Sequence, residues 1–106
     1  SVAPLWQALE DFGADVVLAG HDHSYERFAR QTAAGVADPA GIREFVVGTG
    51  GRSLYGFGTP VANSEVRSNS SSGILKLTLY ASRYTWQFLP VAAGVEVDSG
   101  GEPCHW

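Results

Sequence analysis

The 106-residue sequence has no long apolar run, few basic residues and a single cysteine, and each of these shortages argues against a class of protein. Apolar residues never run for anything close to the ~20 positions that a helix needs to cross a bilayer, so no membrane span is predicted. Lysine and arginine number 7 against 11 acidic residues, without a basic run, so no nucleic-acid partner is expected. The single cysteine, Cys104, cannot form a disulfide within the chain: it is a free thiol or half of a bridge to another segment.

What the sequence does contain is typical of a globular domain. Apolar residues make up 44% of it and the mean hydropathy is -0.03. The length suits one domain or part of a larger one. The first residue is Ser1 and no signal peptide is present, which indicates a processed chain or a piece of a longer protein. We treat residues 1–106 as part of one domain, with core strands in 1–90 and a polar tail in 91–106.

The first half of the chain has the pattern of an α/β unit. Pro4 and Gly13 flank apolar residues at helical spacing, which predicts a helix over residues 4–12. The β-branched run at residues 15–19 predicts a strand that is covered on both faces. Other expected segments are extended chain at 25–30, a loop at 31–41, a strand at 44–47, a long Gly- and Ser-rich loop at 52–72 and a short strand at 95–97.

Residues 74–89 predict a β-hairpin. With a two-residue turn at Ala81-Ser82, every second residue of one arm faces an aromatic residue of the other, and the opposite side is mainly polar. The apolar pairs are Leu79 with Tyr84, Leu77 with Trp86 and Leu75 with Phe88. This register places one apolar face on a core.

Two of the three histidines, His21 and His23, flank one aspartate in the segment LAGHDHSYERF, residues 18–28. Neutral imidazole is the commonest metal ligand, and His21 and His23 can grip one metal or reach two metals in a dinuclear centre. They follow a predicted buried strand, and open α/β sheets bind ligands at the carboxyl ends of their strands. The pair therefore indicates a metal site, although two ligands do not complete one.

The string GHDHSYER at residues 20–27 resembles the last metal motif of the calcineurin-like metallophosphoesterases, and among them the purple acid phosphatases. FVVGTGG at residues 45–51 is similar to the strand and glycine turn that follow in that family, and residues 73–88 are similar to its closing hairpin. The resemblance implies an α/β (α+β) fold: part of a four-layer αββα sandwich, here one short helix and several strands ending in the hairpin.

The same resemblance implies a phosphoesterase parent, a hydrolase acting on phosphate monoesters or diesters. His21 would ligate one metal ion and His23 the other, each of the two ions being Fe, Zn or Mn. A metal-bound hydroxide would attack phosphorus in line while both cations neutralise charge on the phosphoryl oxygens. A secreted or periplasmic parent is also expected, from the resemblance and the lone tail cysteine.

The other metal motifs of the family, D-x-H, G-D-x-x-D or -N, G-N-H and a separate upstream histidine, are absent from this sequence. The chain therefore resembles the carboxyl-terminal portion of such an enzyme, without the amino-terminal half that would carry those ligands. We expect the isolated chain to be inactive and to bind divalent metal weakly. Uncovered strand edges should also make it self-associate.

Other residues of the motif and the glycine turn are candidates for supporting the metals or contacting substrate. Asp22 is either an acceptor for an imidazole N–H or a solvent-facing residue. Tyr25 and Arg27 either contact phosphate or brace the metal loop through an Arg–carboxylate or cation–π contact. Gly50 and Gly51 form a turn or a backbone cradle for phosphate. Gly20 removes a side chain where the two imidazoles approach.

An alternative from a different class is a β-rich interaction module without catalytic activity. Its metal site would be degenerate, or mononuclear and built from His21, His23 and the Cys104-His105 pair, which is a donor set that suits tetrahedral zinc. The long chain between the two pairs argues against the mononuclear version.

Overall fold

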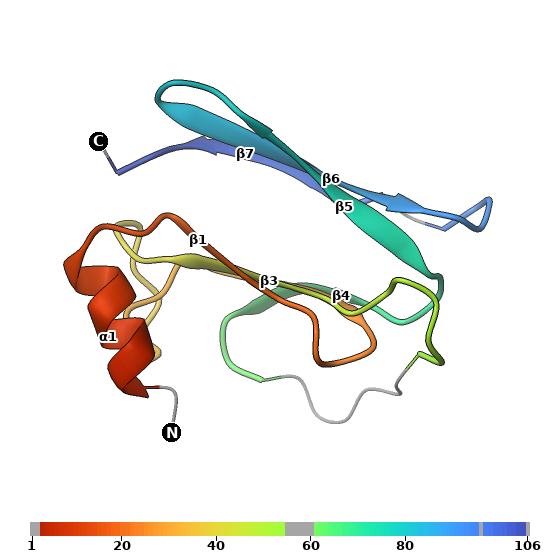
Figure 1. The fold of residues 1–106 in the computed structure, drawn as a ribbon, viewed down its shortest axis with the longest axis horizontal. Helices are drawn as coiled ribbons and strands as arrows, with labels where there is room; N and C mark the ends of the chain where they lie inside the picture. The colour runs from red at the N-terminus through yellow and green to blue at the C-terminus, as the bar shows by residue number, and fades with distance from the viewer. Residues whose placement is uncertain (1–2, 55–60, 96, 106) are drawn as a thin grey trace.

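The computed structural model describes residues 3–54, 61–95 and 97–105 (Figure 1). Within these ranges the chain forms one helix and seven strands. In chain order they are α1 (Ala3–Asp11), β1 (Val16–Ala19), β2 (Tyr25–Phe28), β3 (Arg43–Val47), β4 (Ser64–Ser68), β5 (Gly73–Leu79), β6 (Arg83–Pro90) and β7 (Ser99–Pro103). None of the described residues forms a helix that is long and apolar enough to cross a membrane.

The strands form two sheets that lie face to face, with α1 beyond the outer side of the first sheet (Figure 1). The first sheet has the order β1-β3-β2-β4, and only its β1–β3 pair is parallel. The second sheet is antiparallel, with the order β5-β6-β7. This α/β arrangement agrees with the fold class expected from the sequence.

The predicted hairpin is confirmed in its register. Leu79 pairs with Tyr84, Leu77 with Trp86 and Leu75 with Phe88. The three aromatic residues of β6 are buried. The leucines that face them from β5 are more exposed: Leu75 and Leu77 are half-buried, and Leu79 is 77% exposed. Because β6 is the central strand and β5 an edge strand, the same apolar face is buried on one arm and partly open on the other.

Aromatic side chains fill the space between the two sheets. Tyr25 stacks on Phe88 with ring centroids 4.4 Å apart, and Phe45 meets Trp86 edge to face at 5.5 Å. These four residues and Tyr84 form the buried core cluster. Aromatic contacts of this kind contribute ~0.5–1.5 kcal/mol each beyond area burial. The core therefore ties β2 and β3 of the first sheet to β6 of the second.

Three expectations for the later part of the chain need correction. The long loop at residues 52–72 contains a strand, β4, which pairs with β2. The short strand expected at residues 95–97 is not found in the described part of that segment, and Glu96 lies outside the described residues. A further strand, β7, follows the hairpin, so the hairpin is not the last element of the chain. The segment that the sequence predicts to be a polar tail therefore supplies an edge strand to the second sheet.

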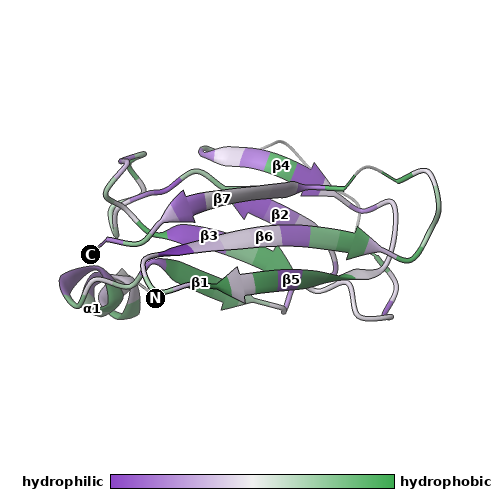
Figure 2. Cartoon of the chain, turned by 90° about the horizontal axis from the view of Figure 1, so that it is seen from above, coloured by the Kyte–Doolittle hydropathy of each residue, from purple (hydrophilic) through white to green (hydrophobic). Residues whose placement is uncertain are grey.

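The expectation that residues 15–19 form a strand covered on both faces is also wrong for this chain. β1 lies at the edge of its sheet, and Leu18 is 58% exposed. Viewed from above, β1 lies beneath β5, the edge strand of the other sheet, so two apolar strand edges are open on the same side (Figure 2).

Candidate metal centre

The GHDHS loop, residues 20–24, crosses the carboxyl end of β3. β1 and β2 are joined by this loop but are not neighbours, because β3 lies between them in the sheet. The end of β3 is flanked on one side by β1, where Ala19 pairs with Val46, and on the other by β2, where Tyr25 pairs with Val47. The topology therefore forces the loop over the backbone that follows Val47, at the edge of the sheet where α/β proteins bind ligands.

Gly48 is the residue beneath this crossing. A Cβ atom placed on it would lie 1.8 Å from the carbonyl oxygen of Asp22 and 2.9 Å from that of Gly20. Both neighbours are backbone atoms, which cannot rotate away as a flexible side chain would. The loop and β3 thus meet backbone to backbone, and only glycine permits the contact.

Backbone hydrogen bonds hold the loop on β3. The amide of Ser24 donates to the carbonyl oxygen of Asp22 at 2.9 Å, which closes a tight turn centred on His23. The amide of Gly48 donates to the carbonyl oxygen of Ser24 at 3.1 Å. Ser24 is also 5% exposed. The position of His23 is therefore set mainly by backbone contacts.

The two histidines differ in their surroundings. His21 is exposed, whereas His23 is half-buried and its Nδ1 lies 3.0 Å from the carbonyl oxygen of Ser53. Ser53 follows the glycine turn at the end of β3. The loop thus presents one solvent-facing imidazole and one that is held against the neighbouring segment.

The available donor atoms suit a transition-metal ion but do not complete its coordination. Two imidazoles on one short loop are ligands that Zn, Fe and related metals accept. Among the described residues, no group of three or more His, Cys, Asp and Glu side chains could hold a metal ion. Structural and catalytic zinc sites use at least three protein ligands. His21 and His23 therefore fit as part of a larger ligand set.

The remaining candidates around the motif lie in different places. Asp22 is exposed, which agrees with a solvent-facing side chain. Gly51 has a positive φ of 132°, as a turn-forming glycine would, whereas a Cβ placed on Gly50 would meet nothing within 4 Å. Gly20 is exposed, and the carbonyl oxygen of Val47 would lie 3.6 Å from a Cβ placed on it.

Tyr25 and Arg27 point away from the histidine loop and into the space between the sheets. The Tyr25 hydroxyl donates to Asp98 at 2.5 Å, and Nε of Arg27 donates to the same carboxylate at 2.9 Å. The Arg27 guanidinium also lies 5.2 Å from the ring centroid of Trp86. Both contacts are of the bracing kind that the sequence suggested, and they anchor the start of β2 directly after the loop.

Burial alone would raise the pKa of the Asp98 carboxyl. Its hydrogen bonds with Arg27 and Tyr25 outweigh that effect, so the pKa of Asp98 lies below its ordinary value. Burial and the hydrogen bond to Asp98 raise the pKa of the Tyr25 hydroxyl. Tyr25 therefore stays protonated and Asp98 stays charged near neutral pH, which keeps this contact intact.

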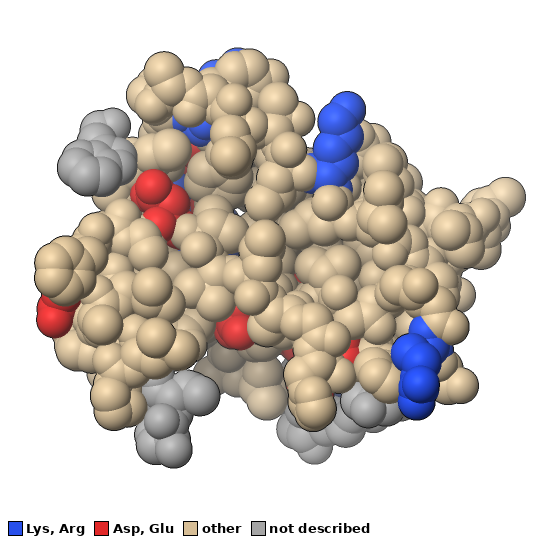
Figure 3. All heavy atoms as spheres, viewed as in Figure 1, with Lys and Arg blue, Asp and Glu red and all other residues tan. Residues whose placement is uncertain are grey.

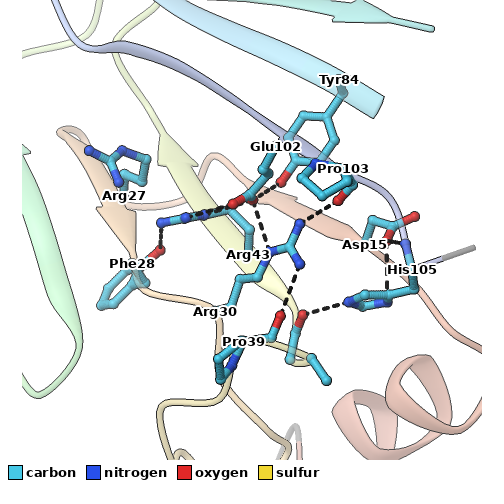
Figure 4. Close-up of polar contacts among 12 residues, drawn as sticks. Asp15, Arg27, Phe28, Arg30, Pro39, Arg43, Tyr84, Glu102, Pro103 and His105 are labelled. Carbon is cyan, nitrogen blue, oxygen red and sulfur yellow. Dashed lines mark hydrogen bonds and ion pairs between the residues drawn. The ribbon is translucent and has the colours of Figure 1, made fainter. Parts of the chain in front are cut away.

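A second part-buried ion pair, between Arg43 and Glu102, was not predicted from the sequence. Nε and Nη2 of Arg43 donate to the two carboxylate oxygens of Glu102 at 3.0 and 2.9 Å (Figure 4). Tyr84 donates to Glu102, and Nε of Arg30 lies 3.2 Å from it. Arg43 also pairs with Glu65. These contacts join β3 of the first sheet to β7 of the second.

Trp86 contacts both arginines. The Arg27 and Arg43 guanidinium groups each stand 5.2 Å from its ring centroid. The alternation of residues along β2 and β3 predicts that both arginines face inward, because Arg27 and Arg43 share a face with the buried Tyr25 and Phe45. Inward-facing arginines need carboxylate partners. Two of these partners, Asp98 and Glu102, lie in residues 91–106, where the sequence predicts a polar tail.

The mononuclear zinc site considered from the sequence does not form. His105 lies beside Asp15, its Nδ1 3.2 Å from a carboxylate oxygen, and its Nε2 is 2.9 Å from the carbonyl oxygen of Gly41 (Figure 4). Asp15 precedes β1, whereas His21 and His23 follow it, so the length of the strand, ~13 Å, separates the two pairs. Cys104 is half-buried, and burial together with Asp15 raises the pKa of its thiol.

No basic patch covers the face of the molecule seen in Figure 3, where the Lys and Arg side chains lie apart from one another. Together with the excess of acidic residues, this gives no support to a nucleic-acid partner.

Comparison with known proteins supports the fold. No family model and no curated protein matches the chain. Among solved structures, a purple acid phosphatase isolated from seeds of yellow lupin (Lupinus luteus) matches with a TM-score of 0.78 and 25% sequence identity. The match covers 94% of this chain but 19% of the lupin chain. The chain is therefore purple acid phosphatase-like over nearly its whole length, and the prediction of this resemblance from the sequence is confirmed.

Proposed function

We propose that the chain is the carboxyl-terminal part of a phosphoesterase whose catalytic centre holds two metal ions, with one imidazole to each from His21 and His23. The observation that carries the proposal is the backbone-anchored GHDHS loop at the carboxyl end of β3. The similarity to a purple acid phosphatase supports the same reaction class. The substrates would be phosphate monoesters or diesters.

The part played by this chain is to orient ligands. When bound, two cations would supply Lewis acidity toward the phosphoryl oxygens and lower the pKa of water. The chain contributes a crossing loop, held on β3 by backbone hydrogen bonds, that would set the spacing of two imidazoles. Arg27 and Asp98, between the sheets, hold the strand that follows this loop. A 1 Å displacement of a catalytic group can cost ~100-fold in rate, so such support matters.

The rest of the ligand set would come from the amino-terminal portion of the same domain. Since the chain spans 19% of the lupin protein, ample sequence is available in a protein of that kind to supply the missing ligands. We propose that the activity belongs to the complete protein and that this chain alone is inactive. A secreted or periplasmic location of the complete protein is proposed on the resemblance alone.

Titration of Zn²⁺ into the isolated chain should show weak binding that depends on the GHDHS loop. His21→Ala and His23→Ala should each abolish most of the calorimetric signal, because two imidazoles are the minimum for a chelating pair. His105→Ala is the matched control, since that ring lies at the other end of β1 against Asp15 and Gly41. Two tight zinc sites in the isolated chain would contradict the incomplete ligand set, and binding insensitive to both loop variants would contradict the metal loop.

The amino-terminal portion would also cover the open side of the sandwich. The edges of β1 and β5 border an apolar groove lined by Leu18, Ile74, Leu75 and Leu77. Among the described residues, no strand pairs with the outer edge of β1 or of β5, and β5 has one charged side chain, Lys76, to discourage pairing. We propose that strands of the missing portion pair here in the complete protein.

Without that portion, the isolated chain should self-associate through the same edges. Light scattering coupled to size exclusion should show dimers or larger species that grow with concentration. Leu18→Lys, which places a charge on the β1 edge, should shift the chain to monomer. Val36→Lys is the control, because Val36 is 61% exposed, much like Leu18 at 58%, but lies in the loop between β2 and β3. A clean monomer at high concentration for the unaltered chain would contradict the expectation.

A further inference from the structure

The contact between His23 and Ser53 has a direct consequence for the protonation of the imidazole ring. The Ser53 partner is a carbonyl oxygen, 3.0 Å from Nδ1 of His23. A carbonyl oxygen accepts hydrogen bonds and cannot donate them, so Nδ1 must carry the proton. A neutral imidazole has one N–H, and Nε2 of His23 therefore keeps its lone pair.

Ser53 is exposed and follows the glycine turn at residues 48–51, which is anchored to the second sheet through Thr49. Thr49 is fully buried, and its hydroxyl donates to the carbonyl oxygen of Gly73 at 3.0 Å. The amide of Gly73 in turn donates to the carbonyl oxygen of Thr49 at 2.9 Å. Gly51 then adopts a positive φ of 132°, a conformation that favours glycine. The carbonyl that meets His23 thus belongs to a segment tied at its start to β5.

We propose that the glycine turn, residues 48–51, is a positioning element: through the carbonyl of Ser53, which follows the turn, it selects Nε2 of His23 as the metal-binding atom. The inference rests on the proposed function, in which His23 is a metal ligand. Beyond that function, the proposal names Nε2 as the His23 nitrogen that binds the metal and the Ser53 carbonyl as the group that selects it. It also distinguishes His23 from His21. His21 is exposed, and its ring forms no hydrogen bond with another described residue.

This arrangement would prepare His23 for metal before any metal arrives. Ligating histidines commonly donate their other ring N–H to a carbonyl or carboxylate, which fixes the ring orientation. Removal of such a partner typically costs about 10–100-fold in metal affinity. The backbone carbonyl supplies this effect without adding a charge to the site.

The test is ¹⁵N nuclear magnetic resonance of the histidine rings in the metal-free chain, at a pH where the rings are neutral. His23 should show a protonated Nδ1 and an unprotonated Nε2. A His23 ring protonated at Nε2 would overturn the proposal. Addition of Cd²⁺ should then shift the Nε2 resonance of His23.

Two glycine variants separate positioning from general structure. Gly51→Ala places a side chain at a φ that L-residues rarely adopt, so Ser53 should move, the His23 ring should populate both tautomers, and Zn²⁺ affinity should fall about 10-fold. Gly50→Ala, where a Cβ meets nothing within 4 Å, should leave both unchanged. Amide resonances of the β5–β6 hairpin report whether each variant is folded. An unchanged tautomer ratio in folded Gly51→Ala would overturn the proposal.

Addition of metal tests separately whether Ser53 selects Nε2 of His23 and whether the histidine loop binds metal at all. If Cd²⁺ shifts Nδ1 of His23 instead of Nε2, the selection by Ser53 is wrong, while the metal loop stands. If Cd²⁺ perturbs neither His21 nor His23, the proposed function is overturned, and the metal-selecting role of the turn falls with it.

Discussion

Replacing Gly48 with alanine is expected to lower the free energy of unfolding by about 3 kcal/mol and to displace the GHDHS loop. The new Cβ would stand 1.8 Å from the carbonyl oxygen and 2.6 Å from the carbonyl carbon of Asp22. Real Cβ atoms do not approach other atoms so closely, and both contacts are with backbone. Either the loop lifts from β3 or the end of β3 bends, and each movement breaks the hydrogen bond between Gly48 and Ser24.

Chemical denaturation followed by tryptophan fluorescence measures the stability change, because Trp86 is buried in the core. The ring resonances of His21 and His23 report the loop movement. Gly50→Ala is the matched control: it is the same substitution two residues away, with open space for the methyl group and no positive φ. Equal stability of the two variants would show that the loop does not lie on Gly48.

Replacing Glu102 with glutamine is expected to cost about 3 kcal/mol at neutral pH. The carboxylate binds Arg43 through both oxygens and also accepts from Tyr84, with Arg30 3.2 Å away. The side chain of Arg43 is 10% exposed and that of Glu102 is 14% exposed, so water does not replace the lost charge. A buried guanidinium without its full complement of carboxylates is costly, whereas the amide of glutamine keeps the side-chain volume nearly unchanged.

The same contacts predict how the stability of the unaltered chain depends on pH. Burial alone would raise the pKa of Glu102, but the hydrogen bonds from Arg43 and Tyr84 lower it to about 2. A carboxyl whose pKa is lower in the folded chain stabilises the fold above its unfolded value of about 4.5. That contribution, on the order of 3 kcal/mol, is lost as the pH falls from about 4.5 toward 2. Glu102→Gln should show a flatter stability profile across that window.

The control for this variant is Glu10→Gln, the same change on α1, where Glu10 meets Gln7 at the surface. It should alter stability by less than about 0.5 kcal/mol. Urea titrations at several pH values compare the three chains. A parallel loss of stability with acid in the unaltered chain and in Glu102→Gln would show that Glu102 is not responsible for it.

The register of the hairpin was predictable from the sequence because strand alternation has a period of two. Once Leu77 faces Trp86, the identity of every other pair follows, and a slip of one residue would bury Thr78 and Lys76 instead. The helix was predictable for a similar reason, since its apolar spacing and its flanking Pro4 and Gly13 are local signals.

β4 and β7 were not predictable in this way. Their sequences, SEVRS and SGGEP, have few apolar residues, and each forms a strand because a neighbouring strand offers unpaired backbone groups. Gly100 shows why β7 has its composition: a Cβ there would lie 2.4 Å from the ring of Trp86. A local pattern cannot show such a requirement, because the ring that excludes a side chain comes from another strand.

For the candidate site, the sequence by itself determined the chemistry: two imidazoles on one loop after an apolar strand, in a string that resembles a metallophosphoesterase motif. Only the tertiary structure decided how that loop is held, because β3 enters the sheet between β1 and β2 and forces the loop across Gly48. It also decided that Arg27 and Arg43 face Asp98 and Glu102, more than 55 residues later in the chain. The physical reason is that the type of ligand is a property of single residues, which the sequence shows directly. Burial and pairing depend on contacts between residues far apart in the sequence, which only folding brings together.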